Sequence, residues 1–178
     1  QIFAGDLHSL NTLEHPPDKE AAMEGNCQTG PNTPLLLFAI PNKEERRNDF
    51  EIAVPNGASL ILKHSADGVV PGLNDYVAED GTILHPPVMQ VFWSFRIMIG
   101  VGLAMLALSW FSIFMLWRKG EVGVWTNRAF LLMTFSGWLA TLSGWYTTEI
   151  GRQPWLVTGV LTTKEAVSDV SGGMVLST

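Results

Sequence analysis

The 178-residue sequence has a single cysteine, Cys27, so it cannot form an intrachain disulfide or a CxxC metal site. It is also poor in basic residues, with 11 Lys and Arg against 17 Asp and Glu, for a formal net charge of -6. No strong basic patch occurs, and we expect no nucleic-acid partner. The four histidines all precede residue 88, so the apolar second half offers no histidine ligand of its own.

The two ends of the sequence lack the usual marks of a complete chain. The first residue is Gln1, and no charged segment followed by an apolar core marks a signal peptide. Residues 171–178 read as the start of an apolar helix that is cut short. We therefore expect an internal piece of a longer protein.

The charge divides the chain in two. Residues 1–88 hold 13 acidic and 5 basic residues, whereas residues 89–178 hold 4 acidic and 6 basic residues. Prolines and glycines indicate turns through residues 1–34, with a short helix at 19–24 after a proline pair. Residues 35–40 and 58–62 are apolar runs of strand length, and residues 43–49 between them predict a solvated turn or short helix.

Two long apolar stretches follow. Residues 89–117 contain one charge, Arg96, and exceed the roughly 20 residues that a helix needs to cross a bilayer. Residues 129–152 predict a second span, which ends there because Gln153 precedes a proline. The sequence thus predicts an all-α membrane protein, a fragment of a transmembrane helix bundle with a loop region of mixed short elements at 1–88.

The short links set the expected orientation. Residues 118–128 carry Arg118, Lys119 and Arg128 close to two membrane ends, which predicts that this link is cytoplasmic. Residues 1–88 and the loop at 153–168 then share the extracytoplasmic side, and residues 169–178 begin a truncated third span. The chain is expected in a lipid bilayer as a multi-pass protein.

Residues 96–98 place an arginine and a methionine inside the first span. An ionisable residue in a membrane helix is costly and indicates function, although Arg96 can also snorkel to the interface. Met98 is a possible haem ligand, because a thioether can bind haem iron, or it simply packs against its neighbours.

The second span ends in a polar group on one helix face. Trp138, Trp145 and Arg152 recur every seven residues, and Glu149 lies on the same face. Glu149 and Arg152 either pair at the interface beside anchoring tryptophans, or act as a ligand or proton-handling carboxylate with its charge partner. Outside the spans, Lys19 and Glu24 flank two alanines and taken alone are typical of a solvated surface.

Five blocks occur in order along the chain: GDLHS, HPPDKEAAMEG, LLLFAIPNKEERRNDFEIAVP, FWSFRIM and GWYTTEIGRQPW. Together they strongly resemble subunit I of the cytochrome bd-type quinol oxidases, over essentially all 178 residues. The sequence departs from the usual family pattern at Ser9, at Pro16 and at Asn26-Cys27. The family's subunit is more than twice as long.

The resemblance assigns roles to the unusual residues. It implies that Lys19 and Glu24 bind and oxidise quinol in an extracytoplasmic quinol loop. Met98 is implied as an axial ligand of the low-spin haem b iron and Glu149 as a ligand of the high-spin haem b iron. The remaining implied contacts are Arg96 with the low-spin haem, Arg152 near haem propionates and Trp145 between the haems.

The resemblance also implies the reaction and its setting. The expected function is part of a respiratory terminal oxidase in the prokaryotic cytoplasmic membrane, which oxidises quinol, reduces dioxygen to water and contributes to the proton gradient. Its cofactors are two haems b and a haem d or further haem b, and its partners are the remainder of subunit I and subunit II. Two alternatives stay open: a non-catalytic membrane module that binds haem or quinone, and an inert truncated fragment.

Overall fold

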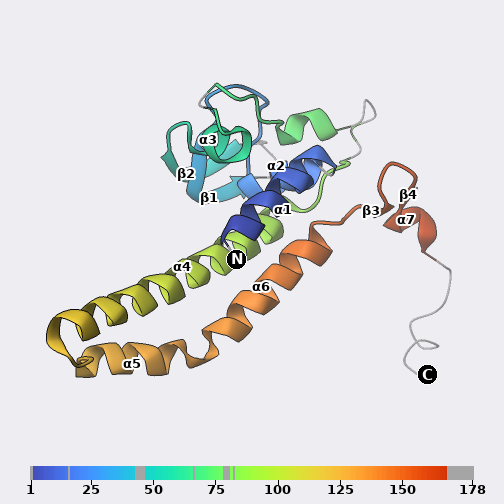
Figure 1. Ribbon diagram of the computed structural model, residues 1–178. Coiled ribbons are helices and arrows are strands. Elements are labelled where there is room, and N and C mark those ends of the chain that lie inside the picture. The colour runs from blue at the N-terminus through green and yellow to red at the C-terminus, as the bar shows by residue number, and fades with distance from the viewer. Residues whose placement is uncertain are drawn as a thin grey trace, which may run out of the picture.

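The computed structural model describes residues 2–15, 17–42, 47–65, 67–77, 81 and 83–167. These residues form a head, residues 2–77, and a limb of two antiparallel helical arms, α4 (Val88–Lys119) and the α5–α6 segment (residues 124–150). The head lies against the N-terminal end of α4, close to the C-terminal end of α6 (Figure 1). Residues far apart in the sequence therefore meet at one end of the limb.

Two helices open the head, α1 (Ile2–Glu14) and α2 (Pro17–Glu24). The expected turn-rich character of residues 1–34 is wrong for α1, because the first proline comes only at position 16. The short helix expected at 19–24 is present as α2. Pro17 begins it, the acidic residues of its first turn suit the helix dipole, and Gly25 ends it at φ 71°.

A hairpin and two short helices complete the head. Strand β1 (Leu35–Asn42) pairs antiparallel with β2 (Arg47–Val54), with register irregularities along β1. The solvated turn or short helix expected at residues 43–49 is thus a strand from Arg47 onward, while residues 43–46 lie outside the described residues. The 3₁₀ turn η1 (Leu73–Tyr76) packs against α2.

Residues 58–62, expected as a strand, belong instead to helix α3 (Gly57–Lys63). Ala58 and Leu62 are buried while Leu60 and Ile61 between them are exposed, which is a helical rather than a strand periodicity. The buried Ser59 hydroxyl accepts from the Thr33 amide and donates to the Gly68 carbonyl, each at 2.8 Å. These bonds hold α3 in the head.

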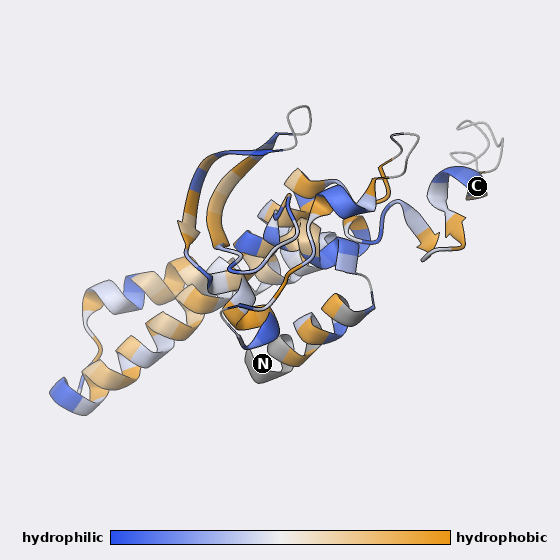
Figure 2. Cartoon of the chain, turned by 90° about the horizontal axis from the view of Figure 1, so that it is seen from above, coloured by the Kyte–Doolittle hydropathy of each residue, from blue (hydrophilic) through white to orange (hydrophobic). Residues whose placement is uncertain are grey.

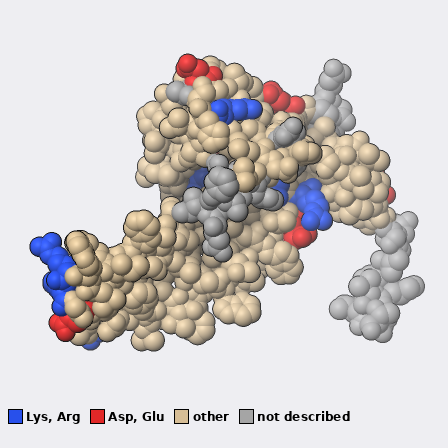
Figure 3. Space-filling view, viewed as in Figure 1, with Lys and Arg blue, Asp and Glu red and all other residues tan. Residues whose placement is uncertain are grey.

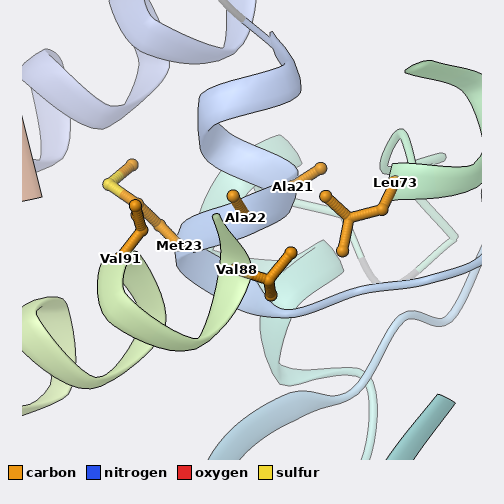
Figure 4. Close-up of a cluster of buried hydrophobic side chains, with 6 residues drawn as sticks. All are labelled: Ala21, Ala22, Met23, Leu73, Val88 and Val91. Carbon is orange, nitrogen blue, oxygen red and sulfur yellow. The ribbon is translucent and has the colours of Figure 1, made fainter. Parts of the chain in front are cut away.

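The head is joined to α4 by an apolar cluster. Its buried members come from α2, η1 and α4: Ala21, Ala22, Met23, Leu73, Val88 and Val91 (Figure 4). Next to it, Phe92 packs with Leu36 and Ala39 of β1. Because both clusters include the first turns of α4, the head has a fixed position on the limb.

Helix α4 contains 32 residues and is capped by Gly120. This glycine adopts φ 74° and donates its amide to the Leu116 carbonyl. In the described part of the chain, α4 is the one helix long and apolar enough to cross a membrane, with a mean hydropathy of 2.2 in its most apolar window. Only 6% of that window is buried, so α4 is not the core helix of a soluble domain. It includes the whole of the expected span 89–117.

The second arm differs from the continuous helix expected over 129–152. It begins earlier, as α5 (Val124–Leu132), passes through the 3₁₀ turn η2 (Met133–Phe135) and continues as α6 (Ser136–Ile150). Hydroxyls explain the interruption: Thr134 donates to the Leu131 carbonyl and Ser136 to the Met133 carbonyl, both at 2.7 Å and both three residues back. A bundle with several spans therefore stays a prediction.

Most residues of the limb are apolar, except at its far end (Figure 2). Lys and Arg gather at that end, where α4 finishes with Arg118 and Lys119 and α5 carries Arg128 (Figure 3). After α6 come β3 (Trp155–Val157), β4 (Leu161–Thr162) and α7 (Thr163–Ala166), so residues 153–167 of the expected loop contain short regular elements. The fold is mostly helical, but the two small sheets show that "all-α" is incomplete. Residues 168–178, and with them the expected third span at 169–178, lie outside the described residues.

Candidate functional site

Glu24, at the end of α2, and Arg96, on α4, form a buried ion pair. The distance from Arg96 Nη2 to Glu24 Oε2 is 2.9 Å, and the two side chains are 11% and 7% exposed. Arg96 Nε also donates to the Leu36 carbonyl at 2.7 Å. The guanidinium thus holds both α2 and β1, and Glu24 is the partner that the sequence alone did not assign to Arg96.

The surroundings of this pair are apolar and aromatic. The guanidinium carbon of Arg96 lies 4.6 Å from the centre of the Phe92 ring and 5.4 Å from that of Phe95. Burial raises the pKa of Glu24, and the nearby positive charge of Arg96 opposes that rise. A carboxylate that is buried beside one cation is the kind of group that binds or transfers protons.

Lys19, at the other end of α2, lies against the C-terminal turn of α6. A β-carbon built on Gly151 would come 3.0 Å from Lys19 Cε, so glycine at this position leaves room for the lysine stem. Burial and then the positive charge of Arg152 lower the pKa of Lys19, while Glu20 and Glu149 oppose this shift. The head therefore touches both arms of the limb at one end.

The polar face at the end of α6 is solvent-accessible in this chain. Glu149 and Arg152 are 3.6 Å apart, with side chains 50% and 58% exposed. Trp145 is exposed and stacks on Tyr146 with ring centres 6.4 Å apart, and Trp138 on the same helix is also exposed. The local pairing of Glu149 with Arg152 is thus present, and most of this face is open to a further ligand or subunit.

Met98 lies at the boundary between α4 and α6. Its Sδ would be 2.9 Å from a β-carbon on Gly144, so a side chain there would displace the thioether. Gly144 therefore provides the space in which Met98 lies. A thioether is a donor that can bind haem iron, and the half-exposed carboxylate of Glu149 is accessible to a ligand. Arg96 and Met98 face different partners, as expected for positions two apart.

Glu20 is a candidate site residue that the sequence did not reveal. It is fully buried, and its Oε1 accepts from the Ser9 hydroxyl at 2.8 Å. Its place four residues before Glu24, on the same helix face, is the one signal that indicated it. The low hydrophobicity of α2 argued for an exposed helix instead.

Known proteins share the sequence pattern and the fold of this chain. The family described as cytochrome bd terminal oxidase subunit I matches residues 1–178. The chain is 34% identical to cytochrome bd ubiquinol oxidase subunit 1 of Bacillus subtilis (strain 168), across 98% of this chain and 39% of the relative. It is 27% identical to cytochrome bd-II ubiquinol oxidase subunit 1 of Escherichia coli (strain K12), across 95% of this chain and 45% of the relative.

The fold is also similar to that of the bd oxidase from Geobacillus thermodenitrificans, with a TM-score of 0.75 and 28% identity. The similarity covers 99% of this chain and 40% of that one. The chain thus spans about two fifths of the length of the first of these relatives and of this structure. Because the family pattern extends over every residue, the chain belongs to the cytochrome bd terminal oxidase subunit I family.

Proposed function

We propose that this chain is the quinol-oxidising part of subunit I of a respiratory terminal oxidase, which passes electrons from membrane quinol to dioxygen. One observation carries the proposal: α2 is fixed to both arms of the limb at one end, by Glu24 on Arg96 and by Lys19 against Gly151. Residues proposed for quinol thus lie on the same end of the limb as Met98 and Glu149.

Lys19 and Glu24 would bind the quinol. A carboxylate accepts a proton as a quinol loses electrons, and an ammonium group stabilises the negative charge that develops on the quinol oxygen. Burial raises the pKa of Glu24 and lowers that of Lys19, so in both cases it favours the uncharged form. These residues therefore hold and deprotonate the substrate at the outer surface.

Met98 would bind the iron of a low-spin haem b and Glu149 that of a high-spin haem b. The haems supply one-electron transfer, and a third haem, d or b, would reduce dioxygen in a part of subunit I outside this chain. Arg152 and Arg96 would neutralise haem carboxylates. Trp145, whose ring is exposed on α6, would lie between the haems.

The proposed setting is the prokaryotic cytoplasmic membrane, with residues 1–88 and 153–168 outside and 118–128 in the cytoplasm. The basic residues at the adjoining ends of α4 and α5 support this orientation, since Lys and Arg favour the cytoplasmic side. The remainder of subunit I, subunit II, quinol and dioxygen would be its partners. A proton gradient follows if quinol protons leave on the outer side.

The test uses full-length subunit I assembled with its partner subunit. Reduced-minus-oxidised spectra are recorded for wild type, Met98→Leu, Glu149→Ala and the control Met105→Leu, two helical turns further along α4. We expect loss of the low-spin haem b band in the first variant and of the high-spin signal in the second. Unchanged spectra in both would contradict the ligand assignment and favour a structural role for these residues.

The alternative of a non-catalytic module that binds haem or quinone has a distinct signature. Such a protein would keep its haem bands but show no oxygen consumption with quinol. Lys19→Ala and Glu24→Gln separate the two functions, because they should reduce quinol oxidation while leaving the haem bands of the complex in place. Retention of full quinol oxidase activity in both variants would contradict the proposed quinol site.

A further inference from the structure

Glu20 is buried in the head without a charged partner of its own. Its relative exposure is 0%, and the Ser9 hydroxyl from α1 lies 2.8 Å from its Oε1. Its other oxygen, Oε2, has no hydrogen-bond partner among the described residues. A buried carboxylate oxygen in this state costs several kcal/mol if the group is ionised.

The charges around Glu20 do not balance. Glu24 lies one turn further along the same face of α2, and Arg96 is the cation that faces both carboxyls. Arg96 is committed to Glu24 at 2.9 Å and to the Leu36 carbonyl. Lys19 is adjacent in sequence but extends to Gly151 on α6. Two buried carboxyls thus share one nearby guanidinium.

Other acidic groups near α2 belong to a different cluster. Asp18 interacts with Tyr76, which η1 brings against α2 together with Asp75. Within the described residues, the groups that act on Glu20 are therefore Ser9 from α1, Glu24 and Lys19 from its own helix, and Arg96 from α4.

A neutral Glu20 resolves the imbalance. In the neutral form the hydrogen bond between Ser9 and Oε1 reverses. The protonated Oε1 donates to Ser9 Oγ, and only an uncharged carbonyl oxygen stays unpaired. Burial raises the pKa of Glu20 to about 7, the negative charge of Glu24 adds to the rise, and Ser9, Lys19 and Arg96 oppose it. The geometry and the charges agree that Glu20 is the carboxyl that gains and loses a proton.

We propose that Glu20 is a proton relay residue of the head, which takes from Glu24 the proton that quinol gives up and releases it past Ser9. This proposal rests on the proposed function. The neutral Glu20 first gives up its own proton past Ser9 and becomes a carboxylate. The quinol O–H bond breaks and an O–H bond forms on Glu24, from which the proton passes to Glu20 and restores its O–H bond, while the electron goes to a haem iron as one-electron oxidant. Glu24 gives up the proton because its anion regains the pairing with Arg96.

The test is infrared spectroscopy of the assembled full-length oxidase over a range of pH. Wild type should show the carbonyl band of a neutral carboxylic acid that disappears as the pH rises through about 7. The band should be missing in Glu20→Gln and unchanged in the control Glu121→Gln, which replaces an exposed acid at the far end of the limb. In Ser9→Ala it should persist to a pH higher by roughly half to one unit, because a bond to the anion is lost.

A band that survives in Glu20→Gln would place the proton on another carboxyl and overturn the proposal. A wild type without a titrating band would mean that both carboxyls are ionised, with the same consequence. These readouts need no turnover, so they stand apart from a failure of the proposed quinol oxidase activity.

The relay step has its own readout in quinol oxidation. Glu20→Gln should lower kcat more than it changes KM and should remove the dependence of kcat on pH near 7. If the band is lost but kcat and its pH profile match those of wild type, Glu20 holds a proton without relaying it, and the relay is contradicted.

Discussion

Glu24 and Arg96 stand 72 residues apart in the sequence and meet at 2.9 Å with both side chains almost fully buried. Glu149 and Arg152 are three residues apart on the end of α6, lie 3.6 Å from each other and are half exposed. The two pairs consist of the same residue types and differ in their exposure to solvent. Water screens the second pair, whereas the first pair holds the head on α4 in an apolar environment, where the attraction between its charges is much less screened.

The strongest destabilisation is expected from Arg96→Met. It leaves the Glu24 carboxyl buried without its cation, which costs about 3–5 kcal/mol of stability for a buried pair. We expect the head to separate from α4, seen as faster protease cleavage within residues 2–77 of the assembled oxidase. Arg47→Met, in the exposed pair with Asp49, is the control. Equal cleavage of both variants would mean that the buried pair does not anchor the head.

The pH dependence of the head should follow Glu20. The pKa of Glu20 is raised from 4.5 to about 7 in the folded state. Its contribution to the free energy of unfolding is therefore complete below pH 4.5 and is lost as the pH rises through about 7. The full loss amounts to about 3 kcal/mol. Protease protection of the head should therefore weaken across this range in wild type and much less in Glu20→Gln. Identical pH profiles would refute the assignment.

Gly144→Ala tests the contact between α4 and α6. The new methyl group would lie 2.9 Å from Met98 Sδ, and this flexible side chain moves at less cost than a helix backbone. We expect thermal stability within about 1 kcal/mol of wild type but a shifted low-spin haem b band. The matched control is Gly137→Ala, which meets nothing within 4 Å. An unchanged spectrum in both variants would contradict the assignment of Met98 as a haem ligand.

The smallest effect is expected at the exposed pair. Arg152→Gln should change stability by less than about 1 kcal/mol, because both charges are already solvated. If Arg152 neutralises haem propionates, the same variant should still lower the reduction potential of the bound haem. A large stability loss with an unchanged potential would make this pair structural, like the buried one.

The limb was largely predictable, because membrane helices are selected by composition. Residues 89–117 hold one charge, and α4 is the result. The interruption at Met133–Phe135 was not predicted, because it depends on the carbonyl groups to which the Thr134 and Ser136 hydroxyls donate. A hydropathy average over the segment does not report such local hydrogen bonds.

The head was less predictable, because its burial comes from contacts between distant segments. The sequence of α2, PDKEAAME, is typical of a solvated helix, yet Glu20 and both alanines are completely buried. They are covered by α1, η1 and α4, which no local pattern reports. The resemblance to a family predicted roles for Lys19 and Glu24, but the partner of Arg96 required the folded head. Those roles stay predictions until quinol oxidation is measured in the Lys19 and Glu24 variants.

The bond from Arg96 Nε to the Leu36 carbonyl uses a main-chain acceptor. Any residue at position 36 that keeps the course of β1 provides the same oxygen, so this contact survives substitution there. The bond from Nη2 needs the carboxyl at position 24 itself. The two ends of one guanidinium are therefore under unequal selection: position 36 is free to drift in this respect, while a change at position 24 has to be matched by a change at position 96.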